Sequence, residues 1–463
     1  MHMDEELNKV MMAIEMANSH GAESCEAYLE TSSGLSITVF EGKVEKFEYS
    51  DVRGLGLRLI KNGRIGRSYT TKVEEEEIEK AVEKAVDAAC VSPPEDYQRL
   101  CPSEFFPPCM DETFDMGSTL GIYSEDLEQR TPEEKISFTL SLESAVREYD
   151  ERIRGVEAAC YNDSVGKVFL ASTNGFKGCY RGSICFGYLT AIAQSKQGDT
   201  QTGFGFTSGR AFNSLNAKDA AQEAAERALS LLDGKQIPSG KAYVLFDNLS
   251  AAEVLAVLGA ALSGEAVTMG RSYLAGRAGQ RIASEIVNVT DDGTLSGGFG
   301  TSPFDAEGAM TKKKEVIRGG ELITYLHNCY TSSKMGTVTT GNASRTSFRS
   351  SVGVSPTNFM LQPGKASPEE LRSQMGRGLE VLELEGVHVG FDPITGEISV
   401  GAKGCWIENG RRVHAVREVI IAGTMDEFLS GIVGIGNDMR FIPLLGGVGT
   451  PSILVEGLVV SGE

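Results

Sequence analysis

Histidine is scarce in this 463-residue chain, and its placement excludes the common zinc-helix motifs. The chain has five histidines, at His2, His20, His327, His388 and His414. None is close enough to another to form HExxH or HxxxH, the spacings that put two imidazoles on one face of a helix. The sequence has no Walker A motif and no GxSxG at a strand-to-helix turn, so neither P-loop nor serine-hydrolase chemistry is indicated.

Long apolar runs are missing as well. No segment approaches the ~18 apolar residues of a membrane-spanning helix. The acidic N-terminus lacks the apolar stretch of a signal peptide. The nine cysteines are odd in number, irregularly spaced and without a CxxC pair, which favours reduced thiols. We therefore expect a cytoplasmic protein with no membrane association.

Positive charge is in deficit. Lysine and arginine total 44 against 64 aspartates and glutamates, which gives a net charge of −20. Such a surface repels phosphate backbones. The longest basic run, residues 312–314, is expected to be a solvated strand edge. We therefore predict no direct binding of nucleic acid.

Glycine, by contrast, is abundant, with 54 residues against 14 prolines. The glycines lie between apolar runs and predict many tight turns. Asn62-Gly63 separates two alternating segments, which is the pattern of a β-hairpin. Helical spacing of apolar residues predicts helices over about 5–19, 73–89, 131–147, 219–232, 250–262 and 368–382.

These patterns predict an α+β protein in two parts. An N-terminal α/β-type part with antiparallel hairpins and long helices is expected over residues 1–236. A mostly antiparallel β domain is expected over residues 240–463, with Pro238-Ser239-Gly240 as the boundary. Five prolines between residues 91 and 122 predict a linker or surface loop, not a packed element, inside the first part.

Candidate catalytic residues are few. Asp291 and Asp292 follow an apolar segment and precede Gly293, so we interpret them as a turn and not as a paired acid site. Gly54-Leu55-Gly56 lacks the rest of a dinucleotide-binding motif and is interpreted as part of a twisted hairpin. Glu265 follows a helical segment rich in alanine and leucine, and alone it indicates only an exposed acid near a helix end. The residues by themselves show no evident catalytic centre.

A set of motifs in a fixed order nevertheless carries a resemblance. Each motif is weak by itself, and the ordered set is specific. The motifs are Gly54-Leu55-Gly56-Leu57-Arg58, Asn62-Gly63-Arg64-Ile65-Gly66, Val244-Leu245-Phe246-Asp247, Ala261-Leu262-Ser263-Gly264-Glu265-Ala266-Val267, Asp291-Asp292-Gly293-Thr294-Leu295-Ser296-Gly297-Gly298, Ser302-Pro303-Phe304-Asp305-Ala306-Glu307-Gly308, Gly341-Asn342-Ala343, Pro356-Thr357-Asn358-Phe359, Gly404-Cys405-Trp406-Ile407-Glu408-Asn409-Gly410, Gly436-Asn437-Asp438 and Gly449-Thr450-Pro451-Ser452. Together they resemble the TldD/PmbA peptidase family, and the chain resembles its PmbA/TldE-type members.

The resemblance implies a metallopeptidase system that acts on extended or unstructured peptides. In the catalytic, TldD-type members, an HExxxH helix and a distant cysteine bind zinc, and the glutamate is the general base. Mapped onto this chain, Gly264 and Met269 stand at the two histidine positions, Glu265 is retained, and the cysteine position falls on Ile435. Glycine, a thioether and an alkyl group do not replace imidazole and thiolate as zinc ligands.

The lost ligands favour a pseudoenzyme that itself binds no metal. We expect it to pair with a TldD-type catalytic subunit that holds the zinc, and to contribute structure and a peptide-binding wall. A homodimer is the alternative for the chain in isolation. An extended peptide is expected to add as a strand to an exposed sheet edge. Two other functions stay open: an independently active peptidase of the same family built on Glu265 and remote groups, and a regulatory protein of DNA gyrase.

Overall fold

The structure, a computed structural model, describes residues 2–108 and 117–462. Its α-helices are α1 (His2–Ser19), α2 (Glu75–Val91), α4 (Glu125–Gln129), α5 (Pro132–Arg147), α6 (Ala217–Ser230), α7 (Asn248–Ala261), α8 (Gly264–Thr268), α9 (Cys329–Lys334), α10 (Pro368–Met375), α11 (Val387–Gly390) and α12 (Met425–Ser430). Its strands are β1 (Ser24–Phe40), β2 (Lys43–Lys61), β3 (Arg64–Thr70), β4 (Ile153–Ser172), β5 (Lys177–Gln194), β6 (Thr200–Gly209), β7 (Gly240–Phe246), β8 (Val289–Asp292), β9 (Lys313–Arg318), β10 (Glu321–Leu322), β11 (Ala343–Ser344), β12 (Gly353–Val354), β13 (Phe359–Leu361), β14 (Arg377–Glu385), β15 (Glu397–Glu408), β16 (Arg411–Thr424), β17 (Ile432–Ile435), β18 (Arg440–Ile442), β19 (Val448–Thr450) and β20 (Ile453–Ser461). Within the described ranges, no helix is both long and apolar enough to cross a membrane.

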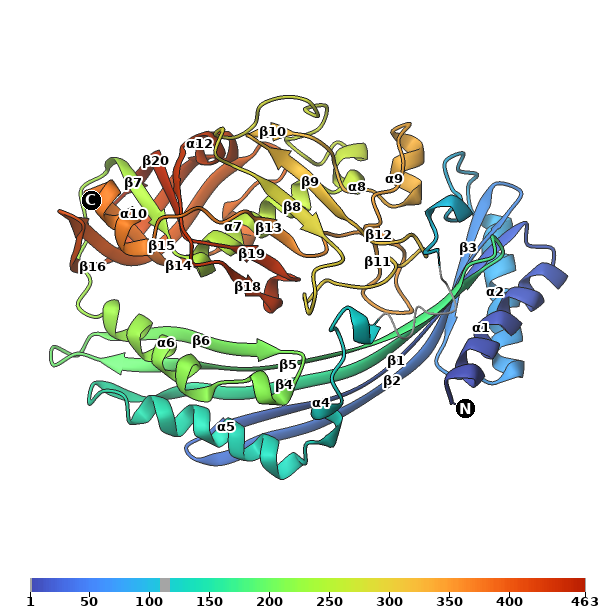
Figure 1. Ribbon diagram of the computed structural model, residues 1–463, viewed down its shortest axis with the longest axis horizontal. Coiled ribbons are helices and arrows are strands. Elements are labelled where there is room, and N and C mark those ends of the chain that lie inside the picture. The colour runs from blue at the N-terminus through green and yellow to red at the C-terminus, as the bar shows by residue number, and fades with distance from the viewer. Residues whose placement is uncertain (1, 109–116, 463) are drawn as a thin grey trace.

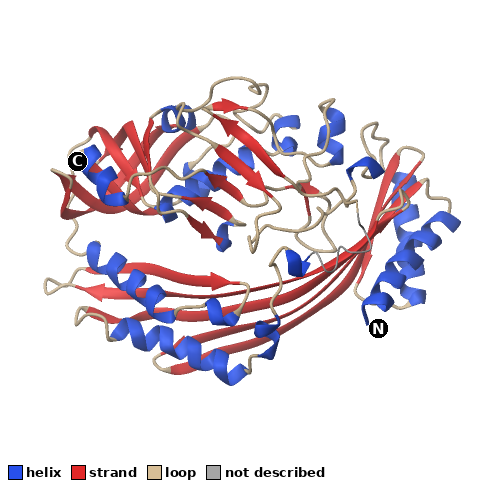
Figure 2. Cartoon of the chain, in the orientation of Figure 1, coloured by secondary structure: helices blue, strands red, loops and turns tan. Residues whose placement is uncertain are grey.

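A long, curved antiparallel sheet of six strands forms the N-terminal half, in the order β3-β2-β1-β4-β5-β6. Four of its strands are long, from 17 residues in β1 to 20 in β4, and the sheet extends along most of the molecule (Figure 1). Helices α1 and α2 pack at one end of this sheet, and α5 and α6 pack at the other (Figure 2). Each helix pair closes its own hydrophobic core against the shared strands.

Turn chemistry explains the two N-terminal hairpins. Glu41-Gly42 joins β1 to β2, and Asn62-Gly63 joins β2 to β3; these four residues have φ values between 51° and 71°. Two consecutive positive φ values are typical of the type I′ turn, whose twist matches that of the strands it joins. The hairpin predicted at Asn62-Gly63 is confirmed by the pairing of β2 with β3.

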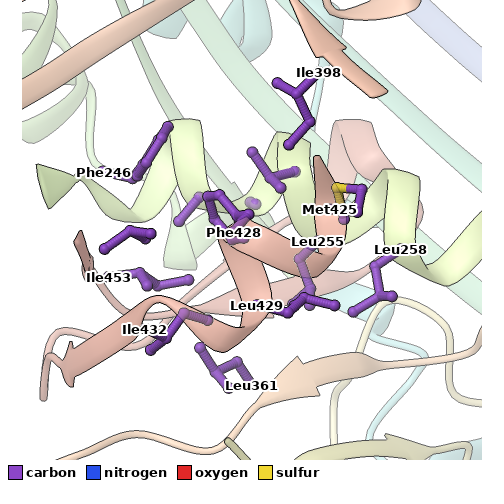
Figure 3. Close-up of a cluster of buried hydrophobic side chains, with 14 of the residues drawn as sticks. Phe246, Leu255, Leu258, Leu361, Ile398, Met425, Phe428, Leu429, Ile432 and Ile453 are labelled. Atoms are coloured by element: carbon purple, nitrogen blue, oxygen red, sulfur yellow. The ribbon is translucent and has the colours of Figure 1, made fainter. Parts of the chain in front are cut away.

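The C-terminal half lies on the inner side of the curved sheet and contains two further six-stranded sheets (Figure 1). Their orders are β10-β9-β8-β13-β19-β18 and β16-β15-β14-β7-β20-β17. Most strand pairs are antiparallel, whereas β7 with β14 and β13 with β19 are parallel. Helix α7 contacts both sheets, and its Leu255 and Leu258 are buried in one core with Phe246, Leu361 and Phe428 (Figure 3). The α+β class, with a mostly antiparallel second half, is confirmed.

In the C-terminal half, the structure contradicts the predicted end of one helix and one predicted turn. The helix predicted over residues 368–382 ends at Met375, because Gly376, with a φ of 65°, turns the chain into β14. Leu379, which continues the helical spacing in the sequence, is a buried strand residue. Asp291 and Asp292 do not form a turn, since both are buried in β8.

The basic run at residues 312–314 explains how β8 tolerates a buried acid. Lys314 Nζ lies 2.8 Å from Asp291 Oδ2 and 2.9 Å from Asn342 Oδ1. A buried carboxylate needs such a partner, because desolvation of an unpaired charge is costly. Lys312 and Lys313 are exposed, so only part of the run is the solvated edge that was expected.

The proline-rich segment predicted over residues 91–122 lies partly outside the described residues, which omit 109–116 and with them Cys109. Its described beginning is packed, contrary to the expectation of an unpacked loop. Cys101 is buried, and the ring of Phe106 lies 5.0 Å from that of Phe176. This stretch therefore helps to cover the long sheet.

Candidate functional site

The retained glutamate lies on α8, a short helix at the C-terminal end of α7. Ser263 caps α8, and its side chain accepts a hydrogen bond from the Glu265 backbone N–H at 3.3 Å. Met269 is the C-cap residue. Gly264, Glu265 and Met269, three of the four positions mapped from the sequence, therefore lie together on one helix.

Gly264 is packed so closely that no side chain fits at its position. Its backbone N–H donates to the Leu326 carbonyl at 2.7 Å. A Cβ atom added to Gly264 would lie 2.4 Å from His327 Nδ1 and 2.8 Å from the Leu326 oxygen. Because real Cβ contacts are longer than 3.0 Å, a side chain at this position requires a neighbour to move.

His327 occupies the space beside Gly264. The residue is 2 % exposed, and its Nδ1 lies 3.1 Å from Thr331 Oγ1 of α9. Burial lowers the pKa of His327 to about 4, so the imidazole is neutral at physiological pH. In the sequence His327 is far from every other histidine, and no local spacing could have shown that it reaches α8.

The other two mapped positions, Glu265 on α8 and Met269 at its C-cap, are open to solvent. Glu265 is partly exposed, and its carboxylate has no ion pair or hydrogen bond to any residue in the described ranges. Its Oε2 atom lies 3.5 Å from the position that a Cβ of Gly353, on β12, would occupy. Met269 is 51 % exposed. The helix therefore presents one carboxylate and one thioether beside a buried imidazole.

The structure does not bring Ile435 to this helix. Ile435 is buried on β17 and pairs with Ile453, which in turn pairs with Phe246. Phe246 directly precedes α7, whereas Gly264 follows it. Since a 14-residue helix is about 21 Å long, Ile435 lies near one end of α7 and the mapped helix lies at the other.

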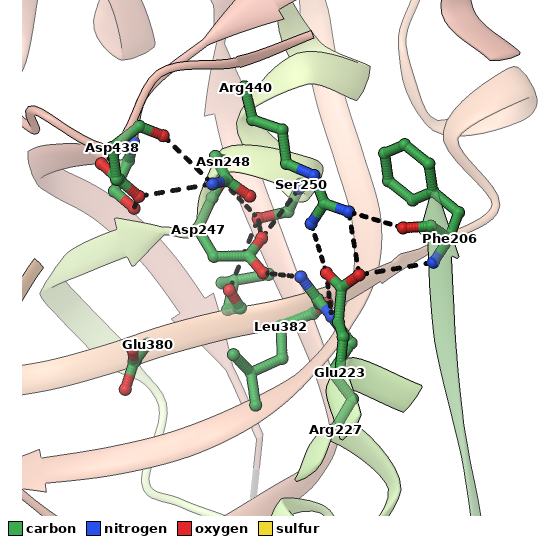
Figure 4. A network of polar contacts seen from close by, with 12 residues as sticks. Phe206, Glu223, Arg227, Asp247, Asn248, Ser250, Glu380, Leu382, Asp438 and Arg440 are labelled. Atoms are coloured by element: carbon green, nitrogen blue, oxygen red, sulfur yellow. Dashed lines mark hydrogen bonds and ion pairs between the residues drawn. The ribbon is translucent and has the colours of Figure 1, made fainter. Parts of the chain in front are cut away.

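Charged side chains join the two halves of the chain at the N-terminal end of α7 (Figure 4). Arg227 of α6 donates to Asp247 Oδ2 at 2.5 Å and to the Leu382 carbonyl at 2.7 Å. Arg440 donates to the two carboxylate oxygens of Glu223 at 2.5 and 2.9 Å. The network borders a cavity of about 490 Å³. Because both guanidinium groups are already engaged, we interpret this network, hereafter the α7 clamp, as structural.

A second buried cluster joins the long sheet to the segment around α9. Arg58 of β2 lies 2.8 Å from Glu26 of β1 and 2.8 Å from Glu307, and Arg345 also pairs with Glu26. Burial by itself lowers the pKa of Arg58, but the carboxylates of Glu26 and Glu307 outweigh it and hold that pKa above its ordinary value. The backbone N–H of Cys329 donates to Glu307 at 2.8 Å, which ties the cluster to α9, the neighbour of α8.

The motif that ends in Arg58 has a packing role. A Cβ on Gly56 would lie 2.0 Å from the Phe348 carbonyl oxygen, and one on Gly54 would lie 2.3 Å from the Phe348 ring. The glycines therefore let a C-terminal segment approach the long sheet closely. Local sequence patterns do not reveal this ionic cluster, although Arg58 and Glu307 both stand in the motifs that carried the resemblance.

Three family domains match the chain in order. Residues 25–89 match PmbA/TldA metallopeptidase domain 1, residues 125–232 match the central domain, and residues 239–462 match the C-terminal domain. The chain belongs to the PmbA/TldD family. This confirms the resemblance that the ordered motifs indicated.

Similar proteins in this family are named as metalloproteases. The chain is 26% identical to metalloprotease PmbA of Escherichia coli O157:H7 over 455 residues, which cover 98% of this chain and 95% of that protein. It is 27% identical to a metalloprotease of Methanocaldococcus jannaschii over 411 residues, 88% of each chain. The PmbA/TldD chain described here is thus metalloprotease-like in sequence.

Solved structures share the fold over the whole chain. A crystal structure from Thermotoga maritima MSB8, named for modulation of a DNA gyrase, has a TM-score of 0.87 and 29% identity, and covers 99% of this chain and 100% of that one. TldE from Thermococcus kodakarensis has a TM-score of 0.86 and covers 98% of this chain and 100% of its own. At 19% identity, the second likeness shows the fold alone.

Membership of a metallopeptidase family implies a zinc ion. The residues at α8 do not provide the ligands that zinc needs. A zinc site needs three or four nitrogen, sulfur or oxygen ligands around one point. Gly264 supplies none, Met269 supplies a thioether, and Ile435 lies elsewhere. Among the residues with described positions, no three histidine, cysteine, aspartate or glutamate side chains converge as a metal site. We therefore assign no catalytic step to a metal in this chain.

Proposed function

We propose that this chain is a PmbA/TldE-type subunit without zinc ligands, which serves as the non-catalytic partner of a TldD-type metallopeptidase. The partner would hold the zinc, and the assembly would act on extended or unstructured peptides in the cytoplasm. One observation carries the proposal. The Cβ that any histidine at position 264 would need lies 2.4 Å from His327 Nδ1 and 2.8 Å from the Leu326 carbonyl oxygen.

The proposed role of this chain is to supply structure and a wall for the peptide. Strand addition at a sheet edge is the recognition mode that we expect, because it binds the backbone of an extended peptide independently of its sequence. Among the residues that the structure describes, no group of three possible metal ligands surrounds Glu265. Hydrolysis is therefore assigned to the partner and not to this chain.

The test compares the purified chain alone with the chain mixed with a TldD-type subunit. Zinc content and cleavage of an unstructured peptide are measured in both samples. We expect substoichiometric zinc in the chain alone, and cleavage only in the mixture. Stoichiometric zinc together with cleavage by the chain alone, abolished by Glu265→Gln, would overturn the proposal in favour of an independently active peptidase.

Regulation of DNA gyrase is the second function left open by the sequence. The name of the Thermotoga maritima relative points in that direction, whereas the net charge of −20 disfavours contact with DNA. A direct protein contact would be detected by co-purification of gyrase with the tagged chain. Co-purification that survives nuclease treatment would favour this function, and its failure would remove it.

A further inference from the structure

A cavity of about 540 Å³ lies where a C-terminal segment meets the α2 end of the long sheet. Its wall is formed mainly by β3 and α2 on one side, and by residues 345–350, between β11 and β12, on the other. Figure 1 shows β3 and α2 at one end of the molecule. Among the described residues that line the cavity, none is acidic and four are cationic: Arg67, Lys84, Arg345 and Arg349. This concentration of positive charge contrasts with the net charge of −20.

Three of these cations are not neutralised. Within the described ranges, Arg67, Lys84 and Arg349 form no ion pair with an acid. Burial, and then the positive charges of Arg58 and Arg345, lower the pKa of Arg67. A cleft lined by charge of one sign concentrates ions of the opposite sign. The cavity is therefore suited to an anion.

Arg345 adds a buried donor that has no acceptor. Its side chain is 4 % exposed. Its Nη1 donates to the Ser350 carbonyl at 3.1 Å, and its Nη2 pairs with Glu26. Its Nε is buried and has no hydrogen-bond partner among the residues that the structure describes. Because buried donors are nearly always satisfied, this N–H group indicates a missing acceptor at the cavity wall.

The acids that approach this region are engaged elsewhere. Glu26 pairs with Arg58 as well as with Arg345. Glu30 accepts a hydrogen bond from the Phe348 backbone N–H at 3.1 Å, and burial raises its pKa. The cavity beside the α7 clamp is different, because acids and arginines line it together. Only the cavity at β3 leaves several cations for a ligand to neutralise.

Aromatic side chains form a further part of the wall. The rings of Tyr69 and Phe348 lie 6.1 Å apart in an edge-to-face arrangement. The guanidinium of Arg349 lies 5.5 Å from the Tyr69 ring centre and 5.1 Å from that of Phe348. These contacts orient the guanidinium without neutralising its charge. Tyr69 is 52 % exposed, so its ring also offers apolar surface to a ligand.

The number of free cations favours a phosphate over a carboxylate. A phosphate monoester carries a charge of about −1.5 to −2 at pH 7 and three acceptor oxygens, whereas a carboxylate carries a single charge and two oxygens. Guanidinium groups match phosphate oxygens with two donors at once. The volume of the cavity also falls within the roughly 300–1,000 Å³ of small-molecule sites, which leaves room for an organic group.

We propose that this cavity binds a small organic phosphate monoester. Arg67, Lys84 and Arg349 hold the phosphate group, and Arg345 Nε donates to one of its oxygens. The organic group contacts the ring of Tyr69. This inference concerns a site remote from the mapped helix α8 in sequence, and it does not rest on the proposed function.

Calorimetric titration of the full-length chain tests the ligand class. The probes are phenyl phosphate, benzoate and inorganic phosphate. We expect one site for phenyl phosphate with a Kd below about 1 mM, and at least about tenfold weaker binding of benzoate, which has fewer charges and oxygens. Inorganic phosphate should also bind more weakly, because it makes no contact with Tyr69. Added sodium chloride should weaken all binding by screening the charges.

Two substitutions test the site itself. Arg67→Gln and Lys84→Gln each remove a cation that forms no ion pair in the described chain, and both residues are exposed, so both variants are expected to fold. Thermal unfolding checks this. Each variant should bind phenyl phosphate at least about tenfold more weakly, and the double variant should show no binding. Arg411→Gln on β16 is the matched control, since it removes an exposed arginine that does not line the cavity; its affinity should equal that of the wild type.

Four results would overturn the proposal. The first is no binding of phenyl phosphate by the wild-type chain. The second is binding that the double variant retains, which places the site elsewhere. The third is equal affinity for benzoate, which makes the cavity a general anion site. The fourth is equal affinity for inorganic phosphate, which assigns the cavity to the free ion. None of these results bears on whether the chain assists a TldD-type subunit, because peptide cleavage is not measured in them.

Discussion

The two ends of α7 differ in how their polar groups are used. At the N-terminal end, the α7 clamp pairs Arg227 with Asp247 and Arg440 with Glu223, so that charges from both halves of the chain satisfy one another. At the C-terminal end, the carboxylate of Glu265 has no hydrogen bond or ion pair within the described residues, and His327 packs directly against Gly264. The N-terminal end of α7 is therefore held by paired charges from both halves of the chain, whereas the carboxylate at its C-terminal end remains open to solvent.

A side chain introduced at Gly264, near the C-terminal end of α7, should have the largest effect on stability. Gly264→His forces a Cβ into the space of His327, and we expect a loss of about 3 kcal/mol in the free energy of unfolding, as for overpacked cores. Denaturant titration measures it. Gly240→His is the control, because a Cβ there meets no atom within 4 Å, and its effect should stay within about 0.5 kcal/mol. Equal losses at both positions would contradict the packing argument.

Removal of an arginine from the α7 clamp should have the second-largest effect on stability. Arg227→Met leaves Asp247 and the Leu382 carbonyl without their donor, so we expect a loss of about 2 kcal/mol in unfolding free energy. The control is Arg152→Met, whose side chain is 45 % exposed in its pair with Asp150. Exposed pairs contribute ~0–1 kcal/mol. A loss for Arg227→Met no greater than for the control would show that the clamp is dispensable.

Glu253 lies between the two ends and should make stability depend on pH. Its Oε2 is buried without a hydrogen-bond partner in the described chain. Burial, then Asp247 and Glu383, raise the pKa of Glu253 to about 7. The folded state therefore holds this proton more tightly than the unfolded state, so the stability present below the ordinary pKa of about 4.3 is lost as pH rises through 7.

Glu253→Gln removes that titration. Relative to the wild type, the variant should gain on the order of 2 kcal/mol in unfolding free energy between pH 4.5 and pH 8. Chemical denaturation of both proteins at the two pH values measures this difference. Wild-type and variant stabilities that change in parallel with pH would show that Glu253 titrates normally.

The smallest effect is expected at Glu265. Because the Glu265 carboxylate forms no hydrogen bond or ion pair with the described residues, Glu265→Gln should change the unfolding free energy by less than about 0.5 kcal/mol. Peptide cleavage by a mixture with a TldD-type subunit should keep its kcat. Thermal unfolding and steady-state kinetics of the mixture provide the two measurements. A tenfold fall in kcat would give this carboxylate a role that its surroundings do not indicate.

Local sequence patterns predicted the fold where local forces decide it. Asn62-Gly63 gave the hairpin because two residues with positive φ leave few alternatives. The apolar spacing over residues 368–382 predicted too long a helix. That spacing continues across Gly376, but the backbone beyond it is a strand. Asp291 was assigned to a turn because two acids precede Gly293. That local pattern does not reveal the pairing of Asp291 with Lys314, which comes from another strand.

Of the candidate site, the sequence predicted only the residues that are neighbours in the chain. Gly264, Glu265 and Met269 fall on one helix, as residues so close in sequence must. His327 reaches the same helix through the pairing of Ser263 with Leu326, a long-range contact that leaves no trace in local spacing. The roles mapped onto Glu265 and Ile435 stay predictions, and the position of Ile435 on β17 gives it no contact with α8 on which such a role could rest.

The long strands have a mechanical consequence. On β1, Cys25 and Ala27 belong to the core under α1 and α2, while Ile37 and Val39 belong to the core under α5. A strand of 17 residues spans roughly 55 Å, and its neighbours are hydrogen-bonded along most of it. Bending between the two helix layers would have to rupture several ladders at once. The sheet should therefore resist bending between its two ends, although its strands come from the first two family domains.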